Sequence, residues 1–108
     1  MKFDIQETAQ NMLSAAAGVL TGEWPGIQAC VTKAFADEQE ALAAIAAARL
    51  AGEIDDDELK SQLDDEAETL TALLLVCEVK TKVAAQKAIN AALKILTEAI
   101  QAALKAAL

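Results

Sequence analysis

Residues 52–59 read GEIDDDEL, and this short stretch predicts a sharp turn between two antiparallel helices. Gly52 suits the left-handed conformation that ends many helices. Asp55 and Glu58 form the capping-box pattern that opens a new helix, and the acidic first turn complements the positive end of the helix dipole. We therefore expect a helical hairpin centred between Glu53 and Ile54.

Apolar residues recur at spacings of three and four on the N-terminal side of this turn, as they do on one face of a helix. The first predicted helix covers about 4–20, with Asp4 and Glu7 in a capping pattern at its start. The second covers about 25–51, and Pro25 fits its first position because the missing N–H is not needed there.

The segment 55–107 contains neither glycine nor proline. It carries two apolar stripes that are not in phase, with a polar patch between them around residues 79–82. A single long helix, or one kinked near 79–82, is the form we predict, because no helix breaker interrupts the segment. The alternative is a break at 79–82 and a fourth helix that folds back into a four-helix bundle.

The composition supports an all-α fold in one domain spanning residues 1–108. Hydrophobic residues make up 55% of the chain but aromatic residues only 3%, and alanine, the best helix former, dominates the difference. One proline and four glycines leave few turns. We therefore predict an antiparallel hairpin or bundle of three helices, with coiled-coil-like spacing in its C-terminal part.

Charge is divided unevenly along the chain, whose formal net charge is −8. Residues 23–68 hold thirteen acids and three bases, whereas residues 69–108 hold two acids and five lysines. This balance argues against binding to nucleic acid, which requires basic contacts to phosphate, and makes a membrane an unfavourable partner. The acidic and basic parts could meet within one chain or between two chains.

A continuous last helix would extend beyond the helices able to cover it. Its uncovered apolar stripe would consist of Ile89, Leu93, Leu96, Ile100 and Leu104. Exposed apolar stripes of this size usually mark an interface, so these residues predict a homo-oligomer, most simply a dimer, or a protein partner. If the chain folds back near residue 80, a monomeric bundle becomes the alternative.

The two cysteines, Cys30 and Cys77, lie almost equally far from the centre of the predicted hairpin. They should therefore sit at one level on neighbouring helices, where a disulfide is feasible. A cytoplasmic location is our default expectation, because the N-terminal residues lack the pattern of a signal peptide. In that compartment two reduced thiols are the expected state.

The residues needed for common catalytic and metal sites are missing from the sequence. The chain has no histidine, which excludes Ser-His-Asp systems and the histidine-containing di-iron sites of helical bundles. The segment from Asp55 to Glu66 has some acids of a calcium loop, but Leu59 and Lys60 stand where an oxygen ligand and a glycine belong. We expect no catalytic residues, no metal and no cofactor.

These features predict a non-enzymatic structural or interaction protein, a self-associating helical bundle with an assembly, adaptor or scaffold role. The alternative is an amphipathic protein that associates with a lipid or granule surface through residues 88–108, in the way Ala-rich phasin-like proteins do. That segment carries no aromatic residue and only two lysines, which favours packing against protein.

Overall fold

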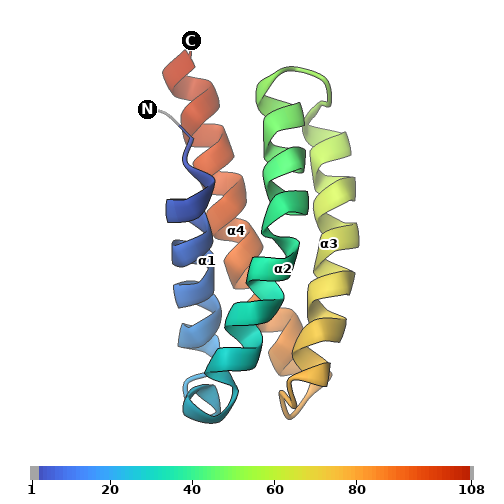
Figure 1. Cartoon of the computed structure of the whole chain (residues 1–108). Helices are drawn as coiled ribbons and strands as arrows, with labels where there is room; N and C mark the ends of the chain where they lie inside the picture. The colour runs from blue at the N-terminus through green and yellow to red at the C-terminus, as the bar shows by residue number, and fades with distance from the viewer. Residues whose placement is uncertain (1–2, 108) are drawn as a thin grey trace.

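A computed structural model describes residues 3–107 of the chain as four antiparallel α-helices (Figure 1). The helices are α1 (Ile5–Val19), α2 (Trp24–Leu50), α3 (Asp56–Val76) and α4 (Lys82–Ala107). They run alternately down and up in a bundle measuring 43 × 23 × 19 Å. The α1–α2 and α3–α4 turns lie at one end, and the α2–α3 turn lies at the other (Figure 1).

The all-α prediction is confirmed, and so is the turn between α2 and α3. Gly52 adopts a φ of 77°, in the left-handed region. The carboxylate of Asp55 accepts a hydrogen bond from the amide of Glu58 at 2.8 Å, and the carboxylate of Glu58 accepts one from the amide of Asp55 at 3.2 Å. The capping box predicted from the sequence is therefore complete.

The prediction of one helix over residues 55–107 is wrong, because the chain reverses after α3 and forms the four-helix alternative. Glu78 occupies the left-handed region with a φ of 71°, the position glycine usually takes after a helix. The amide of Glu78 donates to the carbonyl of Leu75, and the amide of Val79 donates to the carbonyl of Leu74. Because Val79 and Leu74 are both buried, the apolar contact typical of this helix end is available.

The next helix begins with a cap supplied by Thr81. Its Oγ1 accepts a hydrogen bond from the amide of Ala84 at 3.0 Å, as an N-cap side chain does. The carboxylate of Glu23, in the α1–α2 turn, accepts a hydrogen bond from the amide of Lys80 at 2.8 Å. The two turns at this end of the bundle are thereby tied to each other.

The core runs along the centre of the bundle, with α1 packed chiefly on α4 and α2 chiefly on α3. The largest fully buried side chains are Met12, Leu20, Val31, Leu42, Leu70, Leu74, Ile89, Leu96 and Ile100. All four helices contribute to this set. Its one member outside a helix is Leu20, which directly follows α1. The apolar stripe of α4 is therefore part of the core of its own chain.

A disulfide joins α2 to the end of α3. Cys30 and Cys77 lie at one level across the hairpin, with their Cα atoms 5.6 Å apart and their sulfur atoms bonded. Cys77 is buried and immediately precedes the left-handed Glu78, whereas Cys30 is exposed. The bond thus fixes the α3–α4 reversal against α2 and closes a loop of 47 residues.

The first prediction tests the reversal itself. Replacing Glu78 with glycine should raise the free energy of unfolding by about 1 kcal/mol, because a side chain in the left-handed region is strained and glycine is not. Urea unfolding followed by circular dichroism measures the change. The matched control, Gly52→Ala, should lower stability by a similar amount or more. A loss of stability in Glu78→Gly, as expected of glycine inside a continuous helix, would contradict the turn.

The second prediction concerns the disulfide. A Cys30→Ser/Cys77→Ser variant should lose about 4 kcal/mol of unfolding free energy on loop-entropy grounds, since the bond restricts a 47-residue loop in the unfolded chain. Reductant should destabilise the wild-type chain and leave the serine variant unchanged. Equal unfolding midpoints for the two proteins without reductant would show that the bond does not stabilise the bundle.

Candidate interaction groove between α3 and α4

The stripe predicted as an interface lies inside the bundle, so the expectation that it would be exposed is wrong. Leu93 is buried, Leu104 is half-buried, and three more members of the stripe are fully buried. These three are Ile89, Leu96 and Ile100. The reason is the reversal before α4, which brings this helix back onto α1. Only Leu93 among the five also lines a surface depression.

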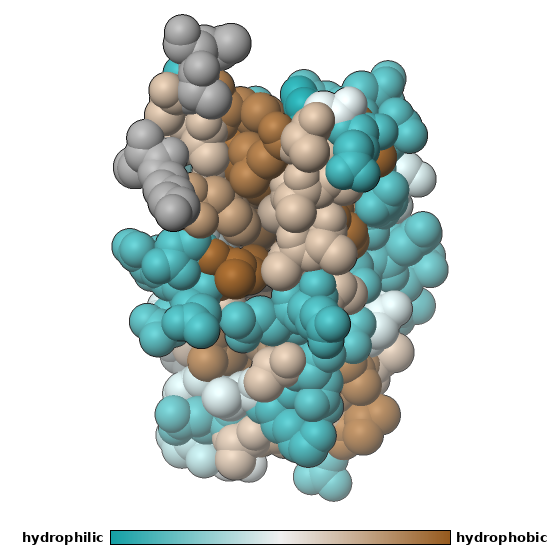
Figure 2. Space-filling view, turned by 45° about the horizontal axis from the view of Figure 1, so that its top comes forward, coloured by the Kyte–Doolittle hydropathy of each residue, from teal (hydrophilic) through white to brown (hydrophobic). Residues whose placement is uncertain are grey.

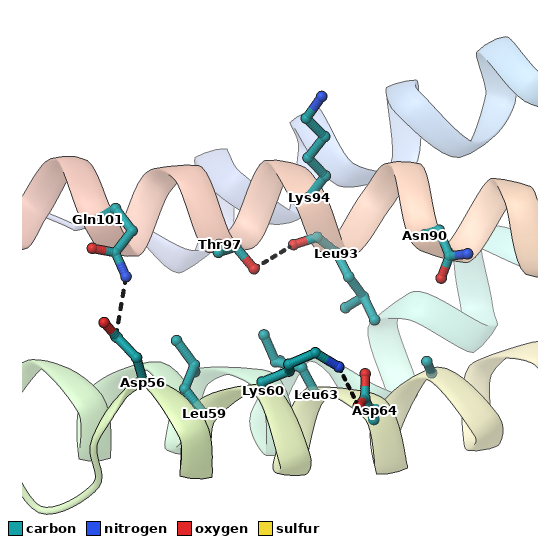
Figure 3. Close-up of a pocket in the computed structure, with 11 residues that line it drawn as sticks. Asp56, Leu59, Lys60, Leu63, Asp64, Asn90, Leu93, Lys94, Thr97 and Gln101 are labelled. Carbon is teal, nitrogen blue, oxygen red and sulfur yellow. Dashed lines mark hydrogen bonds and ion pairs between the residues drawn. The ribbon is translucent and has the colours of Figure 1, made fainter.

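That depression is a groove between α3 and α4, formed by two adjoining hollows of about 440 Å³ and about 610 Å³ that share Ala67 and Asn90. Its α3 wall consists of Asp56, Leu59, Lys60, Leu63, Asp64, Ala67, Glu68, Thr71, Ala72 and Leu75. Its α4 wall consists of Lys82, Gln86, Asn90, Leu93, Lys94, Thr97 and Gln101. Figure 3 shows leucines from both helices pointing into the space between them.

A hydrogen-bonded cluster closes the groove at one end. Asp56 accepts a hydrogen bond from Nε of Arg49 at 2.8 Å. It accepts another from Nε2 of Gln101 at 3.2 Å (Figure 3). These bonds, together with the positive charge of Arg49, lower the pKa of the Asp56 carboxyl. The bond to Gln101 joins α3 to α4 across the groove.

The two walls differ in charge. Three of the four charged residues on the α3 wall are acids, and the fourth, Lys60, forms an ion pair at 2.8 Å with Asp64 of the same wall. This pairing raises the pKa of Lys60. The charged residues on the α4 wall are lysines, Lys82 and Lys94. In residues 3–107 no salt bridge crosses the groove, and Lys94 extends away from α3 (Figure 3).

Large hydrophobic side chains reach the surface on both sides of the α3–α4 turn. Val76 is 77% exposed, Val83 is 60% exposed, and Leu75, which also lines the groove, is 39% exposed. We refer to Leu75, Val76 and Val83 as the apolar tip. Sequence analysis did not single out these residues, because Val76 and Val83 lie outside the apolar stripes. They flank a turn only because the chain reverses between them.

A second apolar area lies on the face shown in Figure 2. Hydrophobic surface fills a furrow in that view (Figure 2). The C-terminal half of α2 also carries exposed alanines, Ala44 and Ala47, whose small side chains make few contacts. The α3–α4 groove and its tip are therefore the more specific candidate.

The chemistry available in the described part of the chain is limited. Residues 3–107 hold no group of three or more Asp, Glu, His or Cys side chains placed to bind a metal ion. Both cysteines are engaged in the disulfide and supply no thiol. Among the same residues there is no helix with the length and apolar character needed to traverse a lipid bilayer.

One acid sits in an unfavourable position between α2 and α3. The carboxylate of Glu66 has an oxygen that is buried without a hydrogen-bond partner among the described residues. Burial, and then the negative charge of nearby Glu38, raise the pKa of Glu66 above its ordinary value of 4.5. At neutral pH this acid is charged in the unfolded chain, so its unfavourable site in the bundle lowers stability.

The third prediction follows from the sign of this shift. The folded chain holds the proton of Glu66 more tightly than the unfolded chain, so stability falls as pH rises from 4.5 through the raised pKa. Glu66→Gln should be more stable than wild type at neutral pH, and the difference should vanish below pH 4.5. Urea unfolding at several pH values measures it. A gain in Glu66→Gln that persists unchanged below pH 4.5 would contradict the assignment to this carboxyl.

Comparisons of the chain with protein-family models, with curated proteins and with solved structures gave no match.

Proposed function

We propose that this chain is a non-enzymatic interaction protein that associates with a second copy of itself and serves as an assembly or scaffold unit. The observation that carries the proposal is the apolar tip, where Leu75, Val76 and Val83 are exposed beside the α3–α4 turn and Leu75 lines the groove with charged walls. Large exposed apolar side chains near charged residues are typical of protein interfaces.

The tip is held by covalent and hydrogen-bonded connections. Cys77 follows Val76 and is bonded to Cys30, and Lys80, between Val76 and Val83, donates its amide proton to Glu23. A surface that is already ordered loses little conformational entropy when it binds. This favours the apolar tip over the exposed alanines of α2 as the contact surface.

The surface-associating alternative loses its original support. It required the apolar face of the C-terminal helix to be available to a lipid or granule surface. Ile89, Leu96 and Ile100 of that face are instead fully buried, so α4 would have to leave the bundle before binding. Self-association through the tip requires no such rearrangement.

The disulfide bears on where the protein works. Structural disulfides persist in oxidising compartments, whereas cytoplasmic thiols are kept reduced. We therefore propose an oxidising compartment for the form that carries the Cys30–Cys77 bond, in place of the cytoplasmic location expected from the sequence. Mass spectrometry of the chain from its native source, with free thiols alkylated before reduction, distinguishes the two locations.

The fourth prediction tests self-association. Sedimentation or light scattering over a concentration series should give a mass approaching twice the 11.3 kDa of one chain. Val76→Ser/Val83→Ser, which adds no charge, should weaken association about ten-fold or more, because each valine contributes roughly 1.5–3 kcal/mol when fully buried.

The control variant, Gln6→Ser/Gln10→Ser, introduces the same two serines at exposed positions of α1. This variant should associate like the wild-type chain. A mass of 11.3 kDa for the wild-type chain at every concentration would rule out the proposed function.

A further inference from the structure

We infer that two copies pair through their α3–α4 faces about a two-fold axis that runs along the groove, so that α3 of each copy lies opposite α4 of the other. The inference rests on the proposed function and specifies its interface. It follows from the opposite charges of the two groove walls and from the matched height of Asp64 and Lys94.

The walls form a self-complementary surface. The α3 wall contributes Asp56, Asp64 and Glu68 with one lysine, and the α4 wall contributes Lys82 and Lys94. A two-fold axis parallel to the groove exchanges the sides of the groove and places an acidic wall opposite a basic one at both contacts. Complementary charge of this kind fixes the orientation of partners.

Such an axis also preserves height along the bundle. The hydrogen bond between Asp56 and Gln101 fixes the register of α3 against α4 and places Asp64 at the height of Lys94. In the pair, Asp64 therefore comes opposite the second copy's Lys94. Glu68 and Lys82 line the same hollow but lie about two helical turns apart along the bundle. The apolar tips of the two copies lie at the same end of the pair.

The other symmetric pairing is disfavoured by the same charges. A two-fold axis perpendicular to the groove, but still within the contact plane, would place α3 on α3 and α4 on α4. Acids would then face acids and lysines would face lysines. Whole-helix charge agrees, because α3 holds seven acids and one base, whereas α4 holds four bases and one acid.

The experiment uses two charge-reversed variants of the full chain. Lys82→Glu/Lys94→Glu makes the α4 wall acidic, and Asp64→Lys/Glu68→Lys makes the α3 wall basic. Each variant alone should associate at least about ten-fold more weakly than wild type, because like charges then face each other. An equimolar mixture should recover association as a mixed dimer, which native mass spectrometry identifies from the mass difference between the variants.

The controls and outcomes separate this inference from the proposed function. Glu40→Lys and Lys105→Glu, on exposed positions outside the groove, should leave association unchanged, and circular dichroism should show that every variant is folded. If each variant alone dimerises as strongly as wild type, the two-fold axis along the groove is wrong. The perpendicular axis would explain that result, because it places like charges opposite each other in wild type and in both variants. A mixture that stays monomeric would overturn the axis along the groove as well. A monomeric wild-type chain would instead remove the proposed function.

Discussion

The reversal between Cys77 and Thr81 turns the apolar stripe of α4 back onto α1, and the rest of the bundle depends on it. Holding Glu78 in the left-handed region costs about 1–2 kcal/mol. Burying Ile89, Leu96 and Ile100 stabilises the fold by roughly 1.5–3 kcal/mol for each side chain. The gain exceeds the strain several-fold, which is why the chain folds back without a glycine or proline at the turn.

The same reversal sets an acidic helix beside a basic one. Apart from the hydrogen bond between Asp56 and Gln101, their charged side chains do not meet across the groove, since the ion pairs of Lys60 and Arg49 are made elsewhere. The contact between α3 and α4 therefore depends on leucine packing below the groove, and the charges at its rim stay hydrated. Those charges consequently contribute little to folding, while they can still discriminate between partners.

The two turns show what the sequence could and could not predict. Gly52 and the Asp55–Glu58 capping box have strong local signatures, and the α2–α3 turn followed from them. The α3–α4 turn uses Glu78 in a conformation that residue type rarely adopts, so its main local signal was the capping side chain of Thr81. Once that turn was missed, buried residues of α4 were assigned to an interface. The exposure of Val76 and Val83 could not be inferred at all, because it depends on where the chain bends.

The covalent bridge and the Glu23–Lys80 hydrogen bond both lie at one end of the bundle. At the opposite end the α2–α3 hairpin relies on its caps and on exposed pairs such as Arg49 with Asp56. We therefore expect rigidity to increase along the long axis from the α2–α3 hairpin to the disulfide. Thermal fraying should start at the α2–α3 hairpin and spread toward the disulfide. Amide hydrogens near residues 50–56 would then exchange with solvent sooner than those near residue 74. A molecule built this way can tolerate motion at the α2–α3 hairpin while the end that holds the α3–α4 turn keeps its shape.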